Sequence, residues 1–299
     1  MAALKLLRSD PRSITIVGLG LIGGSLAAAS RKKFPHARII GVTRNAHALA
    51  KAKKRGWIHE GYRNLDDAFT QKESGPGSDP FCLVVLCTPV NTLKDFLLRI
   101  DRVAPRGTIV TDAGSVKGFL VRWADARKWN RIQFVGAHPM AGSHEQGIDA
   151  AKPDLFARAL TFITPGRRTQ RPALRSAVGF WKKICAKSLV VSAETHDRLT
   201  AQISHVPHLL ASILVESVSS KSLQVAASGF LDTTRIAKSD SGLWTPIFLE
   251  NRKEIGRALK KIESNLKRLE YMLKTGKAGH LRAFLTRAKQ RRSGLEKSP

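Results

Sequence analysis

Four things are scarce in this sequence: cysteine, long apolar runs, aromatic side chains and acidic side chains. Three of its 299 residues are cysteines, and Cys82 and Cys87 stand at opposite ends of one predicted strand, so no framework of disulfide bonds is expected. The longest apolar stretches, such as 81–87 and 209–215, are far shorter than the roughly 20 residues of a membrane-spanning helix. Residues 1–11 also lack the apolar centre of a signal peptide, and we therefore expect a cytoplasmic protein.

The shortage of acidic residues leaves a strongly basic chain, in which 51 Lys and Arg oppose 23 Asp and Glu and the formal net charge is +28. Residues 31–55 contain nine basic residues and no acidic one, which raises the question of a polyanionic partner. Aromatic residues make up 6% of the chain and do not alternate with the basic clusters, so a surface that stacks on nucleic-acid bases is not expected. We interpret the charge as a solvated basic surface and predict no specific nucleic-acid partner.

Strand-like and helical patterns alternate through the first half of the chain. Runs of apolar and β-branched residues predict strands at 13–17, 38–43, 81–87, 108–112, 133–137 and 160–163. Helical patterns lie between some of them, at 22–33, 46–55 and 116–129. This alternation is typical of an α/β, Rossmann-like domain with a mostly parallel sheet that is covered by helices on both faces.

The strand pattern largely disappears after Pro165, apart from 188–191, and helical periodicity replaces it. Apolar residues recur at steps of three and four between Leu199 and Leu214, which is the spacing of one buried helix face. We therefore predict three segments, a Rossmann-like domain, an all-helical domain and a basic tail, at 12–165, 166–287 and 288–299.

A glycine-rich segment follows the first predicted strand and precedes the first predicted helix. It reads Gly18-Leu19-Gly20-Leu21-Ile22-Gly23. In a dinucleotide-binding loop of this spacing the first glycine permits a tight turn, the second lets the backbone approach the pyrophosphate and the third allows close packing of helix on strand. The helix N-terminus adds positive potential, so the sequence predicts a bound dinucleotide.

The end of the second predicted strand indicates which dinucleotide binds. Enzymes that use NAD place a carboxylate there, about twenty residues beyond the loop, to accept hydrogen bonds from the ribose. This chain has Thr43 and Arg44 instead, and a guanidinium can bind a 2′-phosphate. We predict NADP, bound by Thr43 and Arg44 with His47 or Lys51 nearby. The alternative is that Arg44 is simply solvated and that the cofactor is NAD.

Three further polar or rigid positions follow predicted strands, where the ligand crevice of an open α/β sheet lies. His138 stands among glycines after the strand at 133–137, and is either a general base or an ordinary loop or core histidine. Ser115 follows the strand at 108–112, and either contacts a ligand or caps the next helix. Thr88 and Pro89 follow the strand at 81–87, where the fixed φ of proline would shape a tight wall for the nicotinamide.

Six short motifs occur in one order, and together they resemble the prephenate/arogenate dehydrogenases of tyrosine biosynthesis. The motifs occupy 18–24, 86–89, 112–117, 136–143, 204–208 and 232–237. Each string is weakly specific by itself, whereas six at comparable spacings are highly specific, and the resemblance covers roughly 14–274. It implies an NAD(P)-dependent oxidative decarboxylation of prephenate to 4-hydroxyphenylpyruvate, of arogenate to tyrosine, or of both.

The resemblance also implies roles for individual residues. His138 would take the proton of the substrate's 4-hydroxyl as hydride leaves, and Ser115 would lie beside that hydroxyl. Arg235 would bind a substrate carboxylate, with Asp232 orienting the arginine or its loop. His208 would reach the substrate side chain, and His205 would support the wall of the substrate pocket.

The spacing of His205 and His208 does not suggest a metal site, because no acidic or cysteine residue stands at a zinc-binding spacing from them. The resemblance further implies an entwined homodimer, in which amphipathic helices such as the one predicted from Ile255 to Leu273 complete each site.

Substrate choice is predicted from one departure from the family pattern. After Gly142 and Ser143 many relatives carry an acidic residue, where this chain has His144. Ser143 and His144 are predicted to contact the substrate, and an imidazole suits the neutral keto group of prephenate better than the ammonium group of arogenate. The sequence therefore favours prephenate.

Two other functions remain open at this point. One is a dehydrogenase of similar architecture acting on a 3-hydroxy acid, although such enzymes usually depend on a lysine base. The other is a noncatalytic protein that binds a nucleotide or polyanion, which the charge of +28 favours and the combination of His138, Ser115 and Arg235 opposes.

Overall fold

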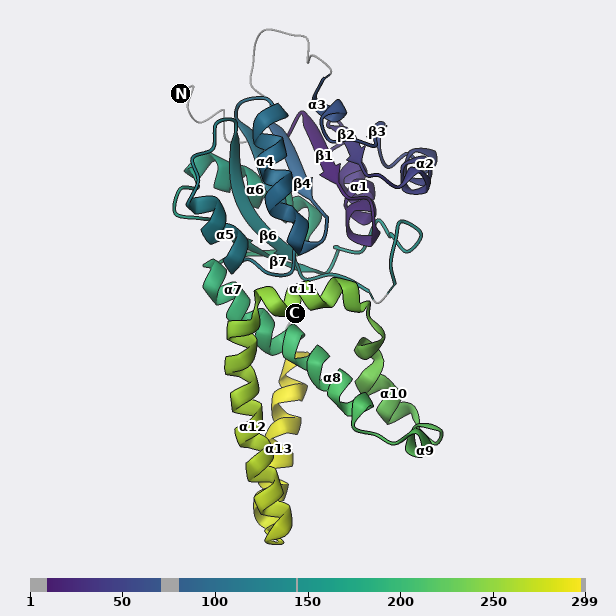
Figure 1. Cartoon of the computed structure of the whole chain (residues 1–299), viewed down its shortest axis with the longest axis vertical. Coiled ribbons are helices and arrows are strands. Elements are labelled where there is room, and N and C mark those ends of the chain that lie inside the picture. Colours follow the sequence, from purple (N-terminus) through teal and green to yellow (C-terminus); the bar gives the residue numbers. More distant parts are fainter. Residues whose placement is uncertain (1–9, 71–80, 144, 297–299) are drawn as a thin grey trace. The chain divides into compact units, whose positions relative to one another are not determined.

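The computed structural model describes residues 10–70, 81–143 and 145–296, and the chain divides into two compact units, Met1–Asn251 and Arg252–Pro299. An eight-stranded sheet in the order β3-β2-β1-β4-β5-β6-β7-β8 forms the centre of the first unit (Figure 1). The strands are β1 (Ser13–Val17), β2 (Arg38–Val42), β3 (Glu60–Tyr62), β4 (Cys82–Leu86), β5 (Thr108–Asp112), β6 (Ile132–Pro139), β7 (Leu160–Thr164) and β8 (Lys187–Val190). All neighbouring strands are parallel except β6 and β7, which are antiparallel.

Helices cover both faces of the sheet, as the sequence predicts. One apolar cluster joins one face to α1 (Leu21–Lys33), α2 (Ala46–Lys54) and α6 (Arg171–Ile184). A second cluster joins the other face to α4 (Leu93–Val103) and α5 (Gly118–Asp125). The short helices α3 (Asp67–Thr70) and η2 (Val90–Thr92) complete this part of the chain. The predicted α/β, Rossmann-like fold class is confirmed.

Several elements differ from the sequence pattern, and β3 corresponds to no predicted strand. The helix expected at 116–129 is shorter, because α5 begins at Gly118 and ends at Asp125. The sheet also continues beyond Pro165 through α6 to the edge strand β8. Leu189 and Val190 of that strand are 45% and 46% exposed. An edge strand that is exposed in this way does not need the long apolar run that marks a buried central strand, and its sequence signal is therefore weaker.

Helices form the rest of the first unit and the whole described part of the second. The first unit continues with α7 (Ala193–Thr200), the π-helical turn η3 (Ala201–His205), α8 (Val206–Glu216), α9 (Ser220–Leu223), α10 (Ser228–Thr234), η4 (Arg235–Lys238) and α11 (Ser241–Glu250). The second unit has α12 (Arg252–Lys274) and α13 (Ala278–Glu296), which contact each other across a turn at Gly276. In the part of the chain that the structure describes, no helix is long and apolar enough to span a membrane.

The α13 helix runs through most of 288–299, the segment that the sequence assigns to a basic tail.

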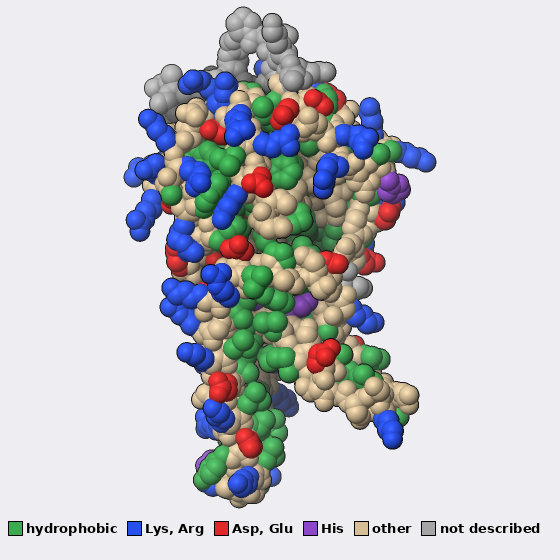
Figure 2. Space-filling model, viewed as in Figure 1, with side chains coloured by type: hydrophobic (Ala, Val, Ile, Leu, Met, Phe, Trp, Pro, Cys, Tyr) green, Lys and Arg blue, Asp and Glu red, His purple; other side chains and the backbone are tan. Residues whose placement is uncertain are grey.

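Basic side chains of the first unit are scattered over its visible face and interspersed with acidic ones (Figure 2). This distribution supports the interpretation of the positive charge as a solvated surface.

A candidate active site at the carboxyl ends of the strands

A cavity of about 780 Å³ lies where the central strands end and α8, η4 and α11 begin to cover them. The sheet contributes Gly20, Leu21 and Ile22 after β1, Thr88 and Pro89 after β4, Ser115 after β5, and His138 and Ser143 at and after the end of β6. The helical part contributes His208, Arg235 and Trp244 among others. Residues from both predicted domains therefore meet in one cavity.

The glycine loop has the geometry that a dinucleotide requires. Gly18 has φ +93°, and a Cβ there would lie 2.7 Å from the carbonyl oxygen of Cys87. A Cβ on Gly23 would overlap the carbonyl oxygen of Gly18, whereas one on Gly20 would meet no atom within 4 Å. Gly20 caps α1 without a side-chain hydrogen bond, and the first turn has no acidic residue. Backbone N–H groups at this helix start are therefore available to a pyrophosphate, and these residues fit a dinucleotide.

The residues predicted to select the cofactor lie beyond β2, outside the cavity lining. Arg44 is exposed, and among the described residues none forms a hydrogen bond or ion pair with its side chain. Lys51 and His47 contact Asp149, which follows β6; the His47 Nε2 to Asp149 Oδ2 distance is 3.3 Å. Of the two additional residues considered for phosphate binding, each therefore already has an acidic partner.

His138, the penultimate residue of β6, is the first member of a line of buried polar side chains. It is 9% exposed, and its Nδ1 lies 2.9 Å from Nε2 of His196 on α7. Nδ1 of His196 lies 2.8 Å from Oδ1 of Asp197. The sequence-based reasoning missed both residues, because 58 positions separate the two histidines and an adjacent His–Asp pair was the sole signal.

Asp197 also holds the loop that carries Ser115. Its carboxylate accepts hydrogen bonds from the backbone N–H groups of Lys117 and Gly118, both at 2.8 Å. A carboxylate at this position caps α5 and interacts favourably with the helix dipole. Ser115 therefore does not cap the helix, and its side chain is left to line the cavity.

A buried ion pair lies beneath the same loop. Lys117 and Asp112 have no exposed surface, and their side chains form a salt bridge. Lys117 Nζ also donates to the carbonyl oxygen of Ala137 at 2.8 Å, while Asp112 accepts the backbone N–H groups of Ala137 (3.0 Å) and Gly114 (2.9 Å). The pair thus joins the end of β5 to the end of β6, next to His138.

Burial keeps the imidazoles of this region neutral. It lowers the pKa of His138 well below the usual 6.5, and nearby His196 and Lys117 lower it further. Burial likewise lowers the pKa of His196 to about 2 and that of His205 to about 4. A neutral imidazole at pH 7 can accept a proton, which is the state that a general base needs.

We expect these three buried histidines to make the protein sensitive to acid. Below about pH 6.5 the unfolded chain takes up protons on them, whereas the folded chain, whose pKa values are lowered, does not. The free energy of unfolding should therefore fall between about pH 6.5 and 4, by up to about 1.4 kcal/mol per pH unit for each histidine. Urea unfolding between pH 7.5 and 4.5 measures this slope. His205→Gln should reduce it, the same change at exposed His36 should not, and a stability that stays constant down to pH 5 would contradict the interpretation.

The two histidines of the helical part have different surroundings. His208, 6% exposed, lines the cavity and stacks on Trp244 with ring centroids 3.8 Å apart. His205 is fully buried and is not among the lining residues; its Nδ1 lies 3.0 Å from Nδ2 of Asn251. The described residues contain no group of three or more His, Cys, Asp or Glu side chains that could hold a metal ion.

Of the predicted Asp–Arg pair, one member reaches the cavity. Arg235, at the start of η4, lines it, whereas Asp232 is exposed on α10, and its backbone carbonyl accepts the N–H of Arg235. Ser143 lines the cavity and its Oγ accepts the N–H of Glu145 at 3.1 Å. His144 lies outside the described residues.

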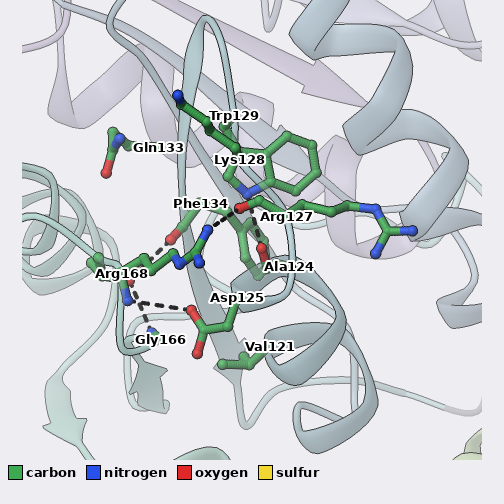
Figure 3. A pocket seen from close by; sticks show the side chains of 11 residues that line it. Val121, Ala124, Asp125, Arg127, Lys128, Trp129, Gln133, Phe134, Gly166 and Arg168 are labelled. Carbon is green, nitrogen blue, oxygen red and sulfur yellow. Dashed lines mark hydrogen bonds between the residues drawn. The ribbon is translucent and has the colours of Figure 1, made fainter.

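A second cavity, of about 170 Å³, lies where the end of α5 meets the turn after β7 (Figure 3). It contains Asp125, which accepts the backbone N–H of Arg167 at 2.8 Å, and Arg168, whose guanidinium donates to the carbonyl oxygen of Arg127 at 3.2 Å. None of the predicted site residues lines it. The larger cavity is therefore the candidate active site.

The fold and the site define a dinucleotide-dependent dehydrogenase of two parts. One part is a sheet with a glycine-rich dinucleotide loop, the other is a helical cover, and a neutral imidazole lies between them. The family model for the nucleotide-binding domain of prephenate dehydrogenase matches residues 26–190, and that for its dimerization domain matches residues 192–287. The chain belongs to the prephenate/arogenate dehydrogenase family.

Known proteins agree with this assignment over most of the chain. Prephenate dehydrogenase of Bacillus subtilis (strain 168) is 35% identical over 293 residues, covering 95% of this chain and 76% of that protein. The crystal structure of prephenate dehydrogenase from Aquifex aeolicus with hydroxyphenyl propionate and NAD+ matches with a TM-score of 0.86 at 29% identity, covering 96% and 99% of the two chains. Synechocystis arogenate dehydrogenase matches with a TM-score of 0.78 at 27% identity, covering 95% and 99%.

The resemblance stated from the six motifs is thus confirmed. The chain is an oxidoreductase with a nicotinamide dinucleotide as cofactor. The family assignment separates it from 3-hydroxy acid dehydrogenases and from noncatalytic nucleotide-binding proteins, the two alternatives that the sequence left open.

Proposed function

We propose that this protein catalyses the NADP-linked oxidative decarboxylation of prephenate to 4-hydroxyphenylpyruvate, with arogenate as the second candidate substrate. The observation that carries the proposal is the position of His138. Its imidazole is neutral, lines the cavity beside Ser115, and faces the same space as the glycine loop. Relatives named for prephenate and for arogenate both match over most of the chain, which supports a substrate of this class.

The chemistry assigned to the chain is a proton transfer that accompanies loss of hydride. A nicotinamide held by the glycine loop and the wall of Thr88 and Pro89 would supply the hydride acceptor for the ring carbon that carries the 4-hydroxyl. His138 takes the hydroxyl proton on Nε2, because Nδ1 is occupied by its hydrogen bond to His196. The bond from the ring to the carboxylate breaks, CO2 leaves, and the electron pair stays in the ring, which becomes a phenolate. Return of the proton from His138 to the phenolate oxygen gives the phenol.

Other residues of the cavity bind and orient the substrate. Ser115 hydrogen-bonds the 4-hydroxyl beside His138, and Arg235 binds a carboxylate, which a guanidinium matches with two parallel hydrogen bonds. His208 contacts the substrate side chain with its ring held against Trp244. His205 and Asp232, which do not line the cavity, act on the site through their neighbours. Thr88 and Pro89 line the nicotinamide end.

A comparison of kcat/KM for prephenate and arogenate tests the function and the substrate together. We expect turnover of prephenate with the higher kcat/KM, because His144 replaces the acidic residue that would attract an ammonium group. A higher kcat/KM for arogenate would overturn the substrate preference. Turnover of neither compound with NADP or NAD would overturn the proposed function.

The cofactor preference for NADP rests on Arg44, which has no partner among the described residues and follows β2, where NAD enzymes carry an acid. Arg44→Ala should raise the KM for NADP about 10- to 100-fold, since a charge-assisted hydrogen bond contributes about 1.5–3 kcal/mol, and should leave the KM for NAD unchanged. Lys54→Ala removes one positive charge from exposed α2 and is the matched control. A wild-type protein that strongly prefers NAD would contradict the assignment.

A homodimer is proposed as the functional form. The model for a dimerization domain matches residues 192–287, and large apolar side chains are exposed on its helices (Figure 2). They include Ile213, Leu214, Leu231, Leu249, Leu266, Tyr271 and Leu273. Light scattering that gives a monomer would contradict this assembly.

A further inference from the structure

The proposed function uses one histidine of a line of three buried side chains. Behind His138 lie His196 and Asp197, both on α7, at successive distances of 2.9 and 2.8 Å. His196 is fully buried and Asp197 is 6% exposed. Neither lines the cavity, so any effect they have on the reaction passes through residues that do, and His138 is the one that His196 contacts.

The hydrogen bonds determine where the protons lie along this line. The two oxygens of Asp197 already face two backbone N–H donors, those of Lys117 and Gly118, and an ionised carboxylate only accepts. Nδ1 of His196 must then carry its proton, and the neutral ring leaves Nε2 as an acceptor. Nδ1 of His138 is therefore the donor to His196, and the lone pair of its neutral ring is on Nε2.

We propose that His196 and Asp197 are positioning residues that hold His138 in the tautomer with a proton on Nδ1 and a free lone pair on Nε2. The inference rests on the proposed function in one respect, that His138 is the base. The opposite tautomer would present an N–H donor to the substrate hydroxyl and could not accept its proton. Burial keeps both rings neutral before the reaction, so one nitrogen of His138 has no proton, and the tautomer decides which nitrogen that is.

The surroundings fix both rings as well as the protons. The ring of His196 meets Phe162 edge to face, at 5.2 Å and 85°, and His138 at 5.1 Å and 67°. Asp197 is held by the first turn of α5 and, through its backbone carbonyl, by Nδ2 of Asn251 at 2.9 Å. Because α5 follows the loop of Ser115, the same carboxylate orients both residues assigned to the substrate hydroxyl.

Nitrogen-15 NMR of the ring nitrogens tests the tautomer directly in the full-length protein without substrate. We expect His138 Nδ1 to have the chemical shift and one-bond N–H coupling of a protonated nitrogen, and Nε2 those of an unprotonated one. In His196→Leu the proton on His138 should redistribute toward Nε2. A wild-type spectrum with the proton on Nε2 overturns the inference, whatever the activity of the protein.

Kinetics supply the second readout. His196→Leu, which has no acceptor, should lower kcat at least 100-fold with little change in the KM for substrate or cofactor. His196→Gln places an amide oxygen near the former Nε2 and should recover at least a tenth of the wild-type kcat. Equal losses in both variants, or a wild-type kcat in the folded leucine variant, would overturn the inference. If His138 is not the base, His138→Asn would keep the turnover of the wild type, whereas the NMR result for the wild type would not change. The two failures are therefore distinguishable.

Discussion

Replacing His138 by asparagine is expected to lower kcat about 10²- to 10⁴-fold, the usual contribution of a positioned general base, while the affinity for the dinucleotide stays unchanged. An amide fits the site and can still form a polar contact with His196, but it has no basic nitrogen to take the hydroxyl proton. The glycine loop that would bind the pyrophosphate belongs to β1 and α1 and does not depend on this side chain.

Steady-state kinetics and a fluorescence titration with NADP measure the two halves of this expectation. His36→Asn, at an exposed histidine, is the matched control and should leave kcat unchanged. Turnover close to that of the wild type in His138→Asn would reject the role of the imidazole. Loss of nucleotide binding would instead indicate that the substitution disturbs the fold around β6.

The second large effect is expected on stability. Lys117→Met should reduce the free energy of unfolding by about 3–5 kcal/mol, because it leaves the buried carboxylate of Asp112 without its partner. Methionine has a volume close to that of lysine, so the loss comes from the uncompensated charge and the missing hydrogen bond to the carbonyl of Ala137. Urea unfolding at pH 7 measures the change.

Two comparison variants separate charge from packing. Asp112→Asn in the Lys117→Met background removes the unpaired charge and should restore part of the lost stability, although an amide oxygen cannot accept as many backbone N–H groups as the carboxylate does. Lys267→Met breaks an exposed pair with Glu263 on α12, and no measurable loss is expected there. Equal stability of Lys117→Met and the wild type would show that the buried pair does not contribute as the geometry requires.

The elements that the sequence predicted well are those whose residues lie close together in the chain. The strands at 13–17 and 108–112 coincide with β1 and β5, since a run of β-branched residues between turn signals is a local property. The glycine loop was readable for the same reason, since its three glycines lie within six consecutive residues between a predicted strand and a predicted helix. The start of α5 was not readable, because Asp197, some 80 residues later, caps it.

By itself the sequence determined the α/β fold class, the dinucleotide loop, the family and the position of His138 at a strand end. These depend on spacing and composition over a few residues, or on motifs in a fixed order. The tertiary structure alone decided that Lys117 and Asp112 are buried together, since a charged side chain in an isolated sequence is expected at the surface. It also decided that His196 and Asp197 stand behind His138, because residues distant in the chain become neighbours only when α7 packs against the end of the sheet.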